Sequence, residues 1–247
     1  VRERVIAETA RHRHEAESAR ATARGDAALE RYATLYHDRG LSSDTSLPVD
    51  FAVDRALAAL ASGRDAAAPS LARIAVIGPG LDFTDKAEGV DLYPPQTIQP
   101  FALIDSLLRS GLAKGPQVRL TAFDLSPRVI EHVRAAVGRA GGGASYDLQL
   151  PLARREPASA WDPALVQYWK DFGGRIGREI PAAGSAEGSP VQLRAVRVRP
   201  EIVAALTAED LDVVVQRRER TGNDDGFDLI IATNVLVYYD RFEQALA

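Results

Sequence analysis

The feature that most constrains the fold is a repeated order of apolar run, turn and helical pattern. Residues 72–77 form a buried-strand pattern that ends in Gly78-Pro79-Gly80, and a helical pattern follows at residues 98–112. Residues 117–123 form a second apolar run, and a helix start follows at Ser126-Pro127. Short strands that alternate with helices are typical of a parallel sheet with helices on both faces. The sequence therefore predicts an α/β fold.

Later apolar runs extend this pattern. Residues 191–198 alternate loosely between apolar and polar positions, which favours a half-buried strand. Residues 211–216 and 227–233 are continuous apolar runs of strand length. The helix that begins after Ser126 is expected to end at Gly138.

The chain divides into a helical segment, residues 1–70, and a sheet-containing domain, residues 71–247. The first 38 residues contain no proline and their apolar positions predict two helices, while residues 50–61 predict another. These helices are expected to form a solvated cap over the core or a homodimer surface. Within the domain, residues 139–190 hold a glycine run and several prolines, which predicts an irregular insertion.

Composition and charge exclude several classes of protein. The chain of 247 residues is 46% hydrophobic, enough for one substantial core, and its net charge of -4 gives no reason to expect a nucleic-acid partner. It has no cysteine, which excludes disulfides, thiolate catalysis and cysteine zinc sites. No apolar run approaches the roughly 18 residues of a membrane helix, so no membrane partner and a cytoplasmic location are expected. His12 and His14 would face different sides of a helix, so no metal site is predicted.

Three predicted strand ends carry residues suited to ligand binding, because ligands bind at the carboxyl ends of parallel strands. Gly78-Pro79-Gly80 lets the backbone approach a ligand closely, although a turn with two glycines is also a common structural element. Asp124 can accept hydrogen bonds from ribose hydroxyls, or it can cap the next helix. Ser126 is better placed as that cap, which would leave Asp124 free. Thr233-Asn234 would place an amide at the same edge, or simply form a turn.

Together these segments resemble the class I S-adenosylmethionine-dependent methyltransferases, which have a Rossmann-like fold. The resemblance rests on VIGPG at residues 76–80, AFDLSPRVIEHV at 122–133 and FDLIIATNVLVYYD at 227–240, in this order. The last segment is most similar to the run found in chemotaxis-receptor (CheR-type) methyltransferases. The resemblance covers residues 71–247 and leaves residues 139–190 unmatched.

The resemblance implies a set of cofactor contacts at the strand ends. These residues are Gly78, Pro79, Gly80, Asp124, Leu125, Asn234 and Val235. The glycine turn would pack against the methionine part of S-adenosylmethionine, while Asp124 would hold the ribose and Leu125 would lie beside the adenine. Asn234 would lie under the methionine part with Val235 beside it. Residues 210–212 would flank the adenine.

The sequence departs from the family pattern in two places. The spacing from Gly80 to Asp124 is much longer than the roughly 20 residues expected between a glycine turn and a ribose-binding acid. The extra residues include a loop, 85–97, which would cover the site with Asp91 or Tyr93 as a contact, or would be a surface insertion without function. The family's sheet also continues beyond the point corresponding to Ala247, so its C-terminal strands are expected to be missing here.

The resemblance predicts transfer of a methyl group to an unidentified acceptor. A carboxylate or phenolate acceptor needs no base, whereas an amine or alcohol needs one, and the candidates are Asp82, Tyr93 and Tyr238. One alternative is a non-catalytic, methyltransferase-like binding module. Another is a nicotinamide-dependent oxidoreductase, which also uses a glycine turn and a strand-end acid but whose third glycine is replaced here by Phe83.

Overall fold

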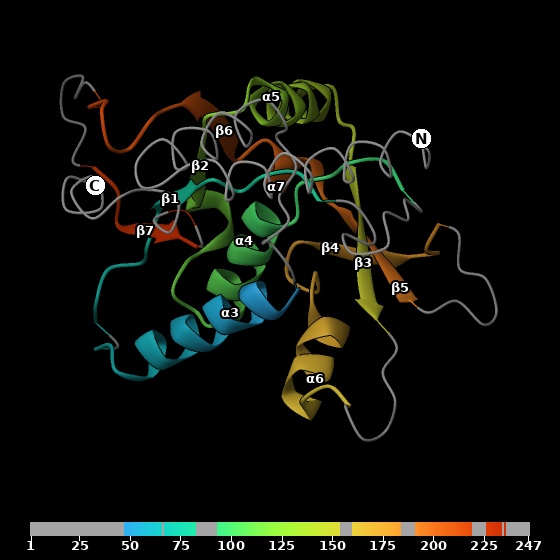
Figure 1. Cartoon of the computed structure of the whole chain (residues 1–247). Helices are drawn as coiled ribbons and strands as arrows, with labels where there is room; N and C mark the ends of the chain where they lie inside the picture. Colours follow the sequence, from blue (N-terminus) through green and yellow to red (C-terminus); the bar gives the residue numbers. More distant parts are fainter. Residues whose placement is uncertain are drawn as a thin grey trace, which may run out of the picture.

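The fold is built on a four-stranded parallel sheet with flanking helices (Figure 1). In this computed structural model the described residues are 47–65, 67–82, 93–153, 160–183, 191–218, 226–233 and 235. The sheet has the order β6-β2-β1-β7 and consists of β1 (Arg73–Ile77), β2 (Arg119–Asp124), β6 (Leu206–Asp210) and β7 (Leu229–Ala232). In chain order these are the third, second, first and fourth parallel strands, as in Rossmann-like sheets. The predicted α/β fold class is therefore confirmed.

In the described part of the chain, α3 (Leu47–Ser62), α4 (Gln99–Arg109) and α5 (Pro127–Gly141) precede or connect these strands, and each confirms a predicted helix. A short helix, α7 (Pro200–Val203), precedes β6. The end predicted for α5, at Gly138, was wrong, because the helix continues to Gly141. A glycine inside a helix costs only about 1 kcal/mol, and burial of Ala140 after it favours continuing the turn. The helices predicted within residues 1–38 lie outside the described residues.

Side chains alternate between the two faces of the parallel sheet. Ile74 lies in register with Leu120 and Leu229, and all three belong to the main core together with the buried residues of α4 and α5. The intervening positions face the other way. There a smaller cluster consists of Ala75, Ile77 and Phe123, with Leu211, Val213, Phe227 and Val235 packed against it.

Helix α4 lies at the centre of the main core. Every residue from 99 to 107 is buried, whereas a helix on a protein surface buries only one stripe. Helix α3 and strand β2 both contact α4. The ring of Phe101 stacks on Tyr146 of a second sheet, with ring centroids 5.1 Å apart. Helix α4 thereby joins two sheets into one core.

Two strands of a second sheet lie in the segment predicted to be an irregular insertion, and the structure corrects that prediction. This sheet is antiparallel with the order β3-β5-β4, and consists of β3 (Tyr146–Ala153), β4 (Gly177–Ile180) and β5 (Val191–Val198). Helix α6 (Pro163–Asp171) lies in the same segment, between β3 and β4. Pro151 obscured the alternation of buried leucines in β3, but β3 lies at the edge of its sheet, where proline is tolerated.

The strand predicted at residues 211–216 was also wrong, because β6 ends just before it. The Asp212 carboxylate accepts the N–H of Val214 at 2.9 Å, and the Asp212 carbonyl accepts the N–H of Gln216 at 2.9 Å. An aspartate that bonds the backbone two residues later stabilises a turn in place of a strand. Val215 is consequently 76% exposed despite its apolar side chain.

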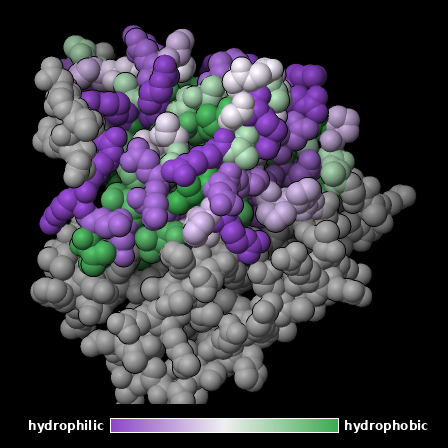
Figure 2. All heavy atoms as spheres, turned by 90° about the horizontal axis from the view of Figure 1, so that it is seen from above, coloured by the Kyte–Doolittle hydropathy of each residue, from purple (hydrophilic) through white to green (hydrophobic). Residues whose placement is uncertain are grey.

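The surface on the side of α5 is largely hydrophilic. Figure 2 views the molecule from above, the side on which α5 lies in Figure 1, and polar side chains surround small apolar areas in its coloured part. The outward positions of α5, such as Glu131 and Arg134, are exposed and charged. None of the described helices is both long and apolar enough to cross a membrane.

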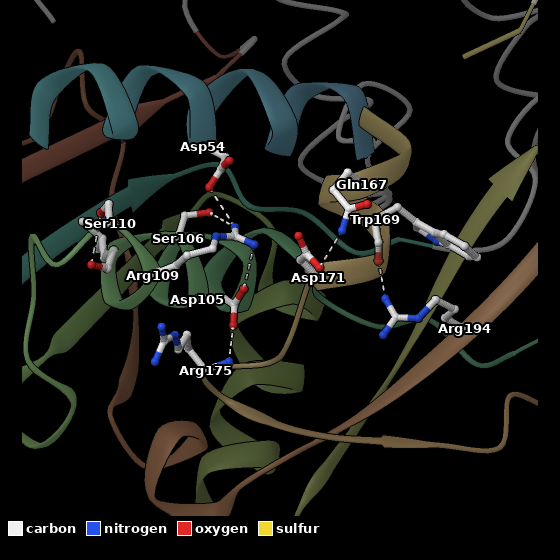
Figure 3. A network of polar contacts seen from close by, with 11 residues as sticks. Asp54, Asp105, Ser106, Arg109, Ser110, Gln167, Trp169, Asp171, Arg175 and Arg194 are labelled. Atoms are coloured by element: carbon white, nitrogen blue, oxygen red, sulfur yellow. Dashed lines mark hydrogen bonds and ion pairs between the residues drawn. The ribbon is translucent and has the colours of Figure 1, made fainter. Parts of the chain in front are cut away.

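A buried acidic group ties α4 to the chain after α6. Asp105 is 1% exposed and accepts the backbone N–H of Arg175 at 2.9 Å (Figure 3). Arg109 lies 3.7 Å from the other carboxylate oxygen of Asp105 and donates to Asp54 of α3 at 2.8 Å. Burial raises the pKa of Asp105, while the Arg175 N–H and the charge of Arg109 oppose this shift.

The raised pKa of Asp105 predicts a specific pH dependence of stability. The folded state holds the proton of Asp105 more tightly than the unfolded state, so the free energy of unfolding falls as pH rises from 3.8 through the higher folded pKa. Asp105→Asn removes this titration and keeps an oxygen for the Arg175 N–H. Chemical unfolding at pH 4 and pH 7 is expected to find wild type losing stability relative to Asp105→Asn at the higher pH. A difference that stays constant, or grows in favour of wild type, would contradict this.

Candidate functional site

The carboxyl ends of β1, β2 and β7 meet at one end of the parallel sheet. Ile77 of β1 lies in register with Phe123 of β2 and with Ala232 of β7. The residues that follow these positions are Gly78, Asp124 and Thr233, so the structure brings the three predicted strand ends together. Asn234 and Tyr238 lie outside the described residues.

At the glycine turn after β1, the backbone lies very close to the residues that follow β7. Gly78 has φ 66° and Gly80 has φ 63°, a left-handed conformation that favours glycine. The N–H of Gly78 donates to the carbonyl of Phe123 at 2.7 Å. A Cβ atom on Gly78 would lie 2.8 Å from Cγ2 of Val235, closer than side chains pack. Glycine is therefore required at position 78 both by its backbone conformation and by its neighbour.

Asp124 organises the turn at the end of β2. Its Oδ1 accepts the N–H of Ser126 at 2.8 Å and its Oδ2 accepts the N–H of Gly80 at 3.2 Å. The expectation that Ser126 caps α5 and leaves Asp124 free was wrong, because Ser126 makes no side-chain capping bond. A carboxylate can accept about four hydrogen bonds, so Asp124 keeps acceptor capacity beyond its bonds to the backbone.

Burial and the neighbouring groups of Asp124 act on its pKa in opposite directions. Burial raises its pKa, and the repulsion of Asp210 acts in the same direction. Hydrogen bonds from the N–H groups of Ser126, Gly80 and Leu125 oppose the shift. Asp210 ends β6 directly opposite Asp124 in the register, so a second carboxylate flanks the same edge of the sheet.

Asp82 and Gln96 bring together the described residues on either side of positions 83–92. They exchange two backbone hydrogen bonds of 2.6 and 3.0 Å. Asp82 and Tyr93, the described candidates for a general base, are both buried, at 4% and 5% exposed. Residues 83–92, including Asp91, lie outside the described residues. Asp82 is close to the glycine turn because it follows Gly80 almost directly in the chain.

Gln96 and Thr97 are anchored to the second sheet by side chains that sequence reasoning missed. The amide of Gln96 donates to the carbonyl of Gln149 at 2.6 Å and accepts its N–H at 2.8 Å, as a neighbouring strand would. The hydroxyl of Tyr146 accepts the N–H of Thr97 at 3.0 Å. Each contact joins this segment to β3 across about fifty positions, which no local pattern reveals.

Tyr146 also bonds His132 of α5, with 2.7 Å between its hydroxyl oxygen and Nε2. Burial lowers the pKa of His132 and raises that of Tyr146, so the neutral forms of both are favoured.

Gln99 connects α4 to the end of β7. It is the first residue of α4 and is 2% exposed, and its Nε2 donates to Oγ1 of Thr233 at 2.6 Å. Its Oε1 is buried and has no hydrogen-bond partner within the described part of the chain. Sequence reasoning missed this residue, because its partner Thr233 lies 134 positions away.

An open cleft lies at the other end of the sheet. Its volume is about 430 Å³, and its walls include Arg119 at the start of β2, Ala205 just before β6, and Arg199. It is thus separate from the strand ends that carry Gly78 and Asp124. Across the described residues, no group of three or more His, Cys, Asp or Glu side chains is arranged to hold a metal ion.

Comparison with known proteins adds no family assignment. No model of a known protein family matches the chain, and no curated protein has a significantly similar sequence.

Proposed function

We propose that the chain binds S-adenosylmethionine and transfers its methyl group to an unidentified acceptor. The observation that supports this most is the combination of strand order and strand-end residues. In this chain the Rossmann-like sheet has a turn with Gly78 and Gly80 after β1, and β2 ends in the carboxylate of Asp124. Ligands bind at this end of such sheets. The resemblance of three ordered segments to class I methyltransferases points to the same cofactor.

The residues present fit this cofactor. Asp124 retains an acceptor position for a ribose hydroxyl while the N–H groups of Gly80 and Ser126 hold its orientation. Gly78 and Pro79 would border the methionine part, with Val235 beside them, and Leu125 would border the adenine. When bound, S-adenosylmethionine supplies an activated methyl group, and the protein supplies position and orientation.

Binding of the cofactor is the first test. Isothermal calorimetry with S-adenosylmethionine and S-adenosylhomocysteine is expected to give saturable binding to the wild-type chain. Asp124→Ala is expected to weaken both ligands by about tenfold or more, since a hydrogen bond to a charged group contributes about 1.5–3 kcal/mol. Asp147→Ala is the matched control, because Asp147 is an exposed carboxylate that pairs with Arg197 on the second sheet.

The outcomes separate the proposal from its competitors. Equal binding by Asp124→Ala and wild type would remove Asp124 from the site. Binding of NADH in place of either S-adenosyl ligand would favour an oxidoreductase. Failure of wild type to bind either S-adenosyl ligand would overturn the proposed function.

A further inference from the structure

We propose that Gln99 accepts a hydrogen bond from the methyl acceptor, and that the acceptor is therefore an amine or an alcohol and not a carboxylate. This inference rests on the proposed function and deepens it, because it names the chemical class that the same site would accept. It is carried by the position of Gln99, by the burial of its amide and by the oxygen of that amide.

The position of Gln99 follows from its hydrogen bond. Its Nε2 donates to Oγ1 of Thr233 at 2.6 Å, and Oε1 shares a carbon atom with Nε2, so the amide oxygen also lies beside Thr233. Thr233 is the first residue after β7. Two residues later, Val235 packs against the glycine turn at Gly78. The Gln99 amide is thus next to the place where the loops after β1 and β7 meet.

The amide oxygen of Gln99 is buried without a hydrogen-bond donor. Gln99 is 2% exposed, and Oε1 accepts no hydrogen bond from the described residues. Thr97, two residues earlier and 1% exposed, likewise has an unpaired hydroxyl oxygen. A buried acceptor without a donor costs free energy that a bound ligand can recover.

The chemistry of that oxygen selects the ligand. An amide oxygen only accepts, so a group bearing N–H or O–H pairs with it, whereas an ionised carboxylate would face it with a second acceptor. The Thr97 hydroxyl can donate or accept and so suits either class. Gln99 is thus the residue that discriminates between donor-bearing acceptors and carboxylates.

Sinefungin provides a direct probe, because it carries an amine where S-adenosylmethionine carries its methylsulfonium. Both ligands are positively charged at that position, but only sinefungin presents N–H donors. Calorimetry on the wild-type chain is expected to find sinefungin bound about tenfold more tightly than S-adenosylmethionine. Gln99→Met has a side chain of similar length without the acceptor oxygen, and is expected to bring the two affinities together. Gln99→Glu keeps an acceptor and is expected to preserve the preference for sinefungin.

Each outcome bears on one of the two proposals. A preference for sinefungin that survives in Gln99→Met would overturn the role of Gln99 alone. Equal weakening of both ligands by Gln99→Met would also overturn it, because Gln99 would then contact a group that they share, such as the amino acid part. Loss of the preference in Gln99→Glu as well would assign Gln99 a packing role. Failure of wild type to bind either ligand would overturn the proposed function itself.

Discussion

Gly177→Ala is expected to lower the free energy of unfolding by about 3 kcal/mol. A Cβ atom at this position would lie 2.2 Å from the carbonyl oxygen of Arg197 and 3.1 Å from Cα of Val198. Both are backbone atoms of β5, so no side-chain rotation can relieve the overlap, and β4 must move away from β5. Overpacking of this kind costs typically 1–3 kcal/mol and occasionally more. Urea unfolding of the two proteins measures the difference.

Gly138→Ala is the matched control for this prediction. Gly138 is exposed on α5, and a Cβ atom there would have no neighbour within 4 Å. Alanine in a helix interior is expected to raise stability by about 0.5–1 kcal/mol relative to glycine. If both substitutions changed stability by similar amounts, the close approach of β4 to β5 would not be a constraint on the fold.

The parallel sheet could be predicted because its signals are local. The apolar runs of β1 and β2 each end in a turn residue with a stated physical role, Gly78 and Asp124. Helix α5 begins at Pro127, and α4 has Pro100 as its second residue, so a proline lies in the first turn of each. Strand, turn and helix start therefore lie within a few residues of one another, which is the distance over which sequence patterns are informative.

Strands β3, β4 and β6 could not be predicted in the same way, whereas β5 matches the strand predicted at residues 191–198. The short strand β4 is stabilised by pairing with β5, and its own sequence, Gly177–Ile180, has only one apolar side chain. The run after β6 has the apolar residues of a strand, but Asp212 bonds the backbone locally and forms a turn. In both places a specific contact decided the outcome against the average preference of the segment.

In the candidate site, too, residues with a local sequence signal were predicted and residues that depend on distant contacts were not. Gly78, Gly80 and Asp124 were predicted because each comes at the end of an apolar run, although the bonds from Asp124 to the turn were not foreseen. Gln99 bonds a partner 134 positions away, and the Tyr146–His132 pair joins a strand to a helix. Glutamine and tyrosine are common in many environments, so only the fold shows that these polar groups are buried together.

Gly78→Ala is expected to reduce both stability and cofactor affinity. The left-handed φ of 66° costs an alanine about 1–2 kcal/mol, and the overlap with Val235 at 2.8 Å adds about 1 kcal/mol or more. The overlap is relieved when Val235 takes another rotamer or when the loop after β1 moves away from the loop after β7. Either change displaces the proposed methionine contacts. Affinity for S-adenosylhomocysteine, measured by calorimetry, is expected to fall at least about tenfold, which corresponds to about 1.4 kcal/mol.

Gly111→Ala separates these two effects. Gly111 has a similar φ of 74°, but a Cβ atom there would have no neighbour within 4 Å, and it lies just beyond the end of α4 farther from the site. It is therefore expected to lose about 1–2 kcal/mol of stability through backbone strain while keeping its affinity for the ligand. Since both variants carry the same strain, weaker binding in Gly78→Ala alone would trace the loss to the contact between the two loops. Equal affinity in the two variants would mean that the glycine turn shapes the sheet edge without contributing to binding.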